Sequence, residues 1–118
     1  MDKLGLRVRA RIDLLPATAG GRKRPIVGGV SYRPNHNFFA PDNREMCMGF
    51  IELPAGRDLW PGQSIALEII LEAWPELRAA IHVGRTWALQ EGAMVVGTGT
   101  VLEVLSEALD GPDRRAPG

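Results

Sequence analysis

The chain has 118 residues, of which 45% are hydrophobic and 24% charged, and its formal net charge at pH 7 is zero. Length and composition are those of one globular domain with a single modest core. Zero net charge excludes a strong attraction to nucleic acid by total charge alone, and no apolar run approaches the ~20 residues of a membrane span. The lone Cys47 excludes an internal disulfide and, with an N-terminus that lacks an apolar signal segment, predicts a cytoplasmic location.

The first half of the chain predicts two strands and two connections. Leu4–Leu14 alternates apolar with charged residues, which is typical of a half-buried strand. A loop of small and basic residues follows at Pro16–Arg24. A second strand is expected to begin at Ile26-Val27 and to end at Pro34, because proline cannot donate to a ladder. Asn35–Asn43 is then expected to be a polar connection.

The middle of the chain predicts two longer strands. Glu45–Leu53 carries apolar residues on both faces, so we expect a central strand that is buried on both sides. A turn rich in proline and glycine follows at Pro54–Gly62. Ile65–Ala73 alternates again, with its odd-numbered apolar residues on the core face. After it, Leu77–Val83 continues a short alternating run, although Pro75–Ala80 fits a single helical turn equally well.

A hairpin is predicted over residues 84–105, with its turn at Glu91-Gly92. Gly97 and Gly99 fall on the same face of its second strand, which suits a sharp bend or the close approach of another backbone. Short strands separated by frequent turn signals predict an all-β antiparallel sandwich or barrel. We therefore expect one domain over residues 1–105, followed by a flexible polar tail over 106–118.

Four segments of the chain are distinctive: GGRKRP at 20–25, YRP at 32–34, IELPAGRDLWPGQ at 51–63 and GRTWALQEGAMVVGTGTV at 84–101. In this order along the chain, they resemble the third domain of translation elongation factor Tu. The resemblance covers about residues 6–105. It implies a small closed antiparallel β-barrel of about six strands, and a free-standing, non-catalytic binding module of translation-factor type.

The resemblance also implies a binding surface. In that family, the loop that matches residues 20–24 and the Glu-Gly turn of the last hairpin face the backbone of transfer RNA. The corresponding RNA- or partner-binding residues in this chain are Arg22, Lys23, Asn35, Glu91 and Gly92. The expected partner is a transfer RNA, another structured RNA or a protein of the translation machinery.

The chain departs from the family pattern at several contact positions. Trp74, Thr86 and Gln90 stand where the family has basic or polar contact residues, and the segment at 75–83 is longer by about three residues. The alternative prediction is therefore a protein-interaction or decoy domain that keeps the barrel without binding RNA. Under that alternative, Trp60 and Trp74 mark a protein-facing patch, although a half-buried place in the core explains them equally well.

The sequence predicts no enzyme, cofactor, metal site or membrane contact. It contains no phosphate-binding loop of the Gly-x-x-x-x-Gly-Lys type, so the GTPase part of elongation factor Tu is absent and no nucleotide binding is expected. His36, His82 and Cys47 lack the spacing of zinc ligands. A Cys–His nucleophile would require the fold to bring Cys47 to a histidine.

Overall fold

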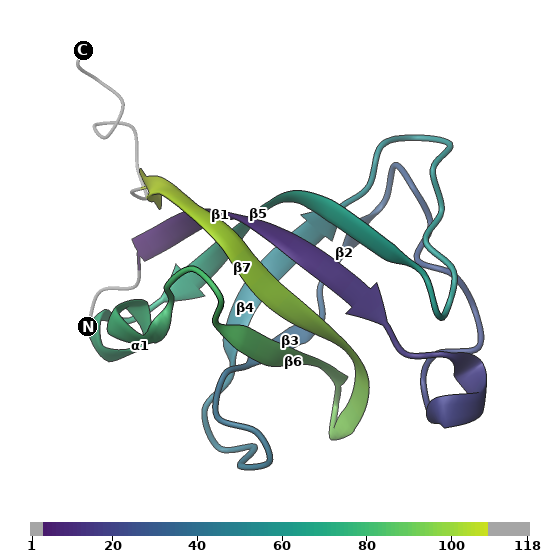
Figure 1. Cartoon of the computed structure of the whole chain (residues 1–118), viewed down its shortest axis with the longest axis horizontal. Coiled ribbons are helices and arrows are strands. Elements are labelled where there is room, and N and C mark those ends of the chain that lie inside the picture. The colour runs from purple at the N-terminus through teal and green to yellow at the C-terminus, as the bar shows by residue number, and fades with distance from the viewer. Residues whose placement is uncertain (1–3, 109–118) are drawn as a thin grey trace.

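The computed structural model describes residues 4–108 as one antiparallel sheet with a short helix (Figure 1). In chain order the elements are β1 (Leu4–Leu14), the 3-10 turn η1 (Ala17–Ala19), β2 (Ser31–Tyr32), β3 (Asn35–Asn37), β4 (Cys47–Glu52), β5 (Ser64–Ala73), α1 (Pro75–Ala80), β6 (Thr86–Glu91) and β7 (Met94–Ala108). Within this described part of the chain, no helix is long and apolar enough to cross a membrane.

The sheet closes on itself. Neighbouring strands pair in the order β4-β3-β6-β7-β1-β5, and β5 returns to β4, which makes a closed antiparallel barrel of six strands. β2 is one extra strand, which pairs with Ile51 and Glu52 of β4 in register with the β3 pairing of Cys47 and Met48. The predicted fold class, a small closed barrel of about six strands, is confirmed.

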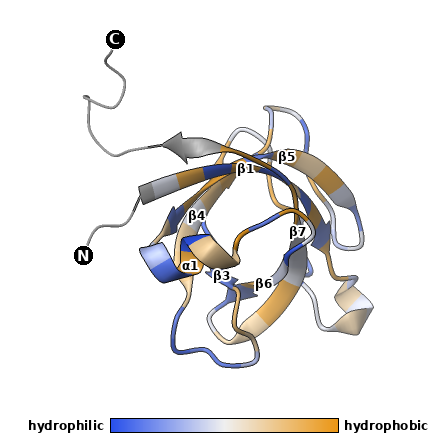
Figure 2. Ribbon diagram, turned by 60° about the vertical axis from the view of Figure 1, so that its left-hand side comes forward, coloured by the Kyte–Doolittle hydropathy of each residue, from blue (hydrophilic) through white to orange (hydrophobic). Residues whose placement is uncertain are grey.

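β1 is the strand around which the sheet is organised. It pairs with β5 from Leu4 to Asp13 and with β7 from Gly5 to Leu14. Its side chains alternate as predicted: Val8 and Ile12 are fully buried in the core, whereas the arginines between them face solvent. Figure 2 shows this alternation of hydrophobic and hydrophilic residues along β1. Burial of this apolar stripe is the main free-energy gain of the strand.

The segment between residues 26 and 37 differs from the prediction. Ile26 makes only an isolated bridge with Leu59, and the second strand is reduced to Ser31–Tyr32. The cause is the glycine pair: Gly29 has a positive φ of 82°, and the chain turns there. A strand, β3, then begins directly after Pro34, inside the expected polar connection. Two of its polar residues, His36 and Asn37, are buried and hydrogen-bonded inside the protein, so their polarity did not indicate a loop.

The prediction that β4 is buried on both sides is wrong. Its residues alternate between buried and exposed, with Cys47 and Ile51 in the core and Met48 and Phe50 outside. The barrel is a single closed layer, and no second layer covers the outer face of β4 in the described part of the chain. Apolar side chains therefore remain on that face.

The later elements agree with the sequence more closely. Pro75–Ala80 forms the helical turn, with proline at its start and Leu77 buried against the barrel. Trp74 is half-buried and packs against the core, whereas Trp60 is exposed. β7 continues to Ala108, beyond the expected end of the domain at Leu105. The rest of the expected tail, residues 109–118, lies outside the described residues.

Two glycines make room for two large side chains inside the barrel. A Cβ atom on Gly99 of β7 would lie 2.4 Å from the indole ring of Trp87 on β6. A Cβ atom on Gly49 of β4 would lie 2.8 Å from Nε2 of His36 on β3. The Trp87 indole N–H donates to Nδ1 of His36 over 3.0 Å, and the ring also stacks on Phe38. Of the two glycines of β7 at which the sequence predicted the close approach of another backbone, Gly97 shows it, since its Cβ would lie 2.5 Å from the backbone oxygen of Asp13, whereas Gly99 faces a side chain.

We predict that Gly99→Ala destabilises the barrel. The new methyl group would overlap the Trp87 ring, which cannot swing away because His36 and Phe38 hold it. Overpacking of this kind costs about 1–3 kcal/mol, measured as the free energy of unfolding in denaturant. The exposed neighbour Thr98→Ala is the matched control, and it should cost less than about 1 kcal/mol. Equal losses in the two variants would contradict this account of the glycine.

His36 is held neutral in the folded protein. Its Nδ1 accepts from Trp87, so the ring proton lies on Nε2, which donates to the Gly49 carbonyl over 3.2 Å. Burial is the larger effect and lowers the pKa of His36 from 6.5 to about 4, while the hydrogen bond to Gly49 opposes the shift. Protonation would place a charge in the core and break the bond from Trp87.

We predict that His36 makes the barrel less stable as the pH falls from 6.5 towards 4. In that window the unfolded chain binds a proton that the folded chain does not, so unfolding becomes more favourable. The loss is on the order of 3 kcal/mol over the full window. Denaturant unfolding at several pH values should show a flatter pH dependence for His36→Gln than for the parent. His82→Gln, at an exposed position, should keep the parental slope; an unchanged slope in His36→Gln would refute the assignment.

Candidate functional site

The structure brings the predicted site residues together around the end of β6. Arg22 contacts Glu91, the last residue of β6, and Gly92 begins the tight turn that follows it. Asn35 is the backbone partner of Gln90 across β3 and β6. Lys23 lies beside Arg22 in the wall of a shallow recess of about 320 Å³ (other lining residues: Gly21, Arg24, Glu91 and Met94). We call the segment 21–24, in which Lys23 and Arg24 are exposed, the basic loop.

Arg22 is anchored to the protein itself. Its guanidinium forms an ion pair with Glu91, and it donates to the carbonyl oxygens of Arg24 and Pro25 over 3.1 and 3.2 Å. The same group lies over the Tyr32 ring, 5.1 Å from the centroid. Each nitrogen of the guanidinium therefore has an internal acceptor. Arg22 positions the basic loop, and its direct contact to a partner stays a prediction.

Glu91 is the centre of this arrangement. One of its oxygens, Oε2, accepts both from Arg22 and from the Tyr32 hydroxyl, the latter over 2.5 Å. Burial raises the pKa of Tyr32 above its ordinary value of 10, and the hydrogen bond to Glu91 raises that pKa further. The three side chains come from the basic loop, β2 and β6. Together they fasten the loop to the barrel wall.

A β-bulge turns Gln90 into the protein beneath the hairpin turn. The register of β6 and β7 shifts between Leu89 and Gln90, and both side chains are buried. Gln90 accepts from the Asn37 amide over 2.7 Å and donates to the Gly92 carbonyl over 3.2 Å. It also donates to Asn43. This buried amide network fixes the turn from below, so Gln90 has a structural role at the position where the resemblance implies an arginine.

Lys23 and Arg24 are the accessible cations of the site. Both are exposed, and neither side chain has a hydrogen-bond or ion-pair partner within residues 4–108. The turn beside them presents Gly92 with a positive φ of 61° and open space around it. Two free cations next to exposed turn amides are suited to bind an anionic backbone, because phosphates accept from both kinds of donor.

Cys47 and His36 are neighbours across β3 and β4, but the arrangement is unsuited to nucleophilic catalysis. Both side chains are buried, and both ring nitrogens of His36 are already hydrogen-bonded. The imidazole therefore has no free nitrogen to accept a thiol proton. Among the described residues, no group of three or more His, Cys, Asp or Glu side chains is placed to hold a metal ion.

No known protein family model matches the chain.

Sequence reasoning missed the parts of the site that depend on residues far apart in the chain. Tyr32 and Gln90 contribute to it through hydrogen bonds to residues far along the chain. Arg24 was visible in the basic run, but the run did not indicate which of its cations is internally paired.

We predict that Tyr32, the single tyrosine of the chain, resists ionisation. Its phenolate absorbance should appear only well above pH 10, because the fold buries the hydroxyl and Glu91 opposes a second negative charge. In Glu91→Gln the opposing charge is gone, so the pKa should move back towards 10. Glu103→Gln, an exposed carboxylate on β7, is the matched control and should leave the titration unchanged. A Tyr32 that titrates near 10 in the parent would contradict the contact.

Proposed function

We propose that the chain is a non-catalytic binding module of translation-factor type that acts in the cytoplasm and contacts the phosphate backbone of structured RNA. Under this proposal Lys23 and Arg24 bind phosphates, and the backbone amides of the turn at Gly92 add uncharged donors. Arg22 and Glu91 hold the loop in place. The preferred RNA is a transfer-RNA-like stem, in keeping with the resemblance to the third domain of elongation factor Tu.

The observation that carries the proposal is that one cation of the basic loop is paired inside the protein while the other two are exposed. Arg22 is fully engaged with Glu91, Tyr32 and nearby carbonyls, whereas the next two cations are exposed and unpaired within the described chain. A loop that is already ordered loses little conformational freedom when it binds. The cations of this loop are therefore better suited to bind a rigid RNA backbone than those of a free polar loop.

A non-catalytic role is supported by the chemistry around the most reactive groups. Cys47 is buried, and both ring nitrogens of His36 form structural hydrogen bonds. The recess beside the basic loop is lined by cations and Glu91 and is shallow. These features support a binding role rather than a catalytic one.

We predict weak, salt-sensitive binding to a transfer-RNA stem. Two neutralised phosphates give a slope of about −2 for log K against log salt concentration. Lys23→Ala with Arg24→Ala should weaken binding at least about tenfold at low salt, in fluorescence anisotropy with a labelled stem. The circular dichroism spectrum should not change.

The control for this experiment removes the same charge elsewhere. Arg44→Ala with Arg57→Ala deletes two exposed loop cations outside the basic loop, and it should change RNA affinity little. If the parent protein does not bind RNA at low salt, the RNA proposal is wrong. The alternative, a protein-interaction or decoy domain with the same barrel, then takes its place.

A further inference from the structure

The outer face of the barrel carries an apolar patch where β4 and β5 meet. It consists of Met48, Phe50 and Ile70, which are 46%, 40% and 43% exposed, and we call it the β4–β5 patch. Phe50 and Ile70 are direct partners across the two strands, so their side chains lie next to one another. The guanidinium of Arg33 lies 4.8 Å from the centroid of the Phe50 ring. Contiguous exposed apolar side chains of this kind mark interaction sites.

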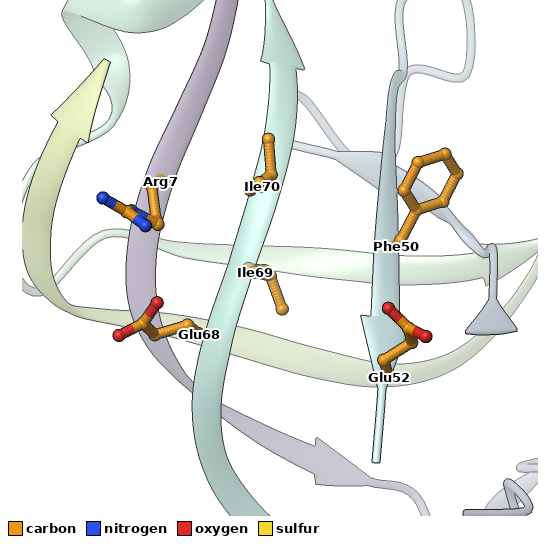
Figure 3. A pocket seen from close by; sticks show the side chains of 6 residues that line it. All are labelled: Arg7, Phe50, Glu52, Glu68, Ile69 and Ile70. Carbon is orange, nitrogen blue, oxygen red and sulfur yellow. The ribbon is translucent and has the colours of Figure 1, made fainter. Parts of the chain in front are cut away.

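A recess lies beside the patch because the two strands part there. β4 and β5 pair only at Gly49–Leu71 and Phe50–Ile70, and the pairing does not continue to Glu52 and Glu68. The resulting hollow has a volume of about 220 Å³. Figure 3 shows Phe50 and Ile70 at one end and the carboxylates of Glu52 and Glu68 towards the other, on opposite strands with Ile69 between them.

The unpaired charge of the recess is negative. Neither Glu52 nor Glu68 has a hydrogen bond or an ion pair within the described chain, and both are exposed. Arg7, the cation that lines the recess, already has an interaction within the protein. Arg33 lies on the Phe50 ring. A ligand that enters this recess therefore meets an apolar surface followed by two carboxylates.

We propose that the β4–β5 patch and its recess bind a segment of a partner protein that presents a bulky apolar side chain flanked by lysine or arginine. The apolar side chain would pack on Phe50 and Ile70, and the flanking cation would pair with Glu52 or Glu68. This arrangement disfavours nucleic acid as the occupant, because the two exposed carboxylates of the recess repel phosphate. It also disfavours an acidic peptide for the same reason. The inference is independent of RNA binding by the basic loop.

The test uses three fluorescein-labelled peptides and the whole chain. The first contains Gly-Ser-Lys-Phe-Lys-Ser-Gly; the second replaces both lysines by glutamate, and the third replaces phenylalanine by serine. Anisotropy titrations at low salt should show the first peptide binding at least about tenfold more tightly than either of the others. Equal binding of the glutamate peptide would overturn the proposal, as would no binding of the first.

Two variants test whether the first peptide binds at the β4–β5 patch and its recess. Glu52→Gln with Glu68→Gln keeps the shape and removes the charge, and it should weaken the first peptide about three- to tenfold. Ile70→Thr keeps the β-branched shape but lowers the apolar contact, and it should weaken the same peptide by at least about threefold. Glu76→Gln with Glu103→Gln, which removes two exposed carboxylates outside the recess, should leave the affinity unchanged.

Other outcomes are equally decisive. If Glu52→Gln with Glu68→Gln binds the first peptide as the parent does, the proposed recognition of a basic segment is wrong. If sedimentation shows a dimer that Ile70→Thr dissolves, the occupant is a second copy of this chain and the proposal is also wrong. Transfer-RNA binding should be unaffected in both variants, so failure of this proposal is distinguishable from failure of the RNA proposal.

Discussion

The hydrogen bond between the Trp87 indole and the His36 imidazole is the interaction on which the rest of the barrel depends. It joins β6 to β3, and each ring also lies against a glycine of the next strand outward, Gly99 on β7 and Gly49 on β4. Four successive strands are thus fixed relative to one another by two side chains. A side chain at either glycine position would overlap the neighbouring ring, and a proton on Nδ1 of His36 would break the bond between the two rings.

The hydrogen bond between Trp87 and His36 also affects the surface, because it positions β6, which ends at Glu91. Trp87 sets the position of that strand, the bulge after Leu89 turns Gln90 inwards, and Glu91 is left at the rim facing Arg22 and Tyr32. The Arg22–Glu91 pair is partly buried and also hydrogen-bonded to Tyr32, so it is better placed than an ordinary surface pair to order a loop. The same strand, β6, therefore connects the barrel core to the proposed RNA-binding surface.

The sequence predicted the parts of the fold that alternate regularly. β1 and β5 show a clear two-residue period, and the hairpin of β6 and β7 has a turn with a glycine before a strand rich in β-branched residues. β3 was not predictable, because His36 and Asn37 are polar residues whose partners, Trp87 and Gln90, lie far along the chain. β4 appeared buried on both faces because periodicity cannot show that its outer apolar residues face solvent.

The sequence predicted where the candidate site lies, but not which of its side chains are paired inside the protein. The basic run and the Glu-Gly turn both belong to it, and the fold brings them together. The run alone did not show that Arg22 is paired internally, since its partner Glu91 is 69 residues away along the chain. Which cation is free for a ligand is a property of the folded chain. The proposed roles of Lys23 and Arg24 follow from that property.

The most direct test of the central claim is an amide NMR titration of the protein with a transfer-RNA stem. The account predicts chemical-shift changes confined to the basic loop at 21–24 and the turn at 91–94, with no change at residues 48–52 and 68–71 around the β4–β5 patch. Those changes should fade as salt is raised. Shifts that cluster on the β4–β5 patch, or no shifts at low salt, would contradict the claim that the basic loop binds RNA.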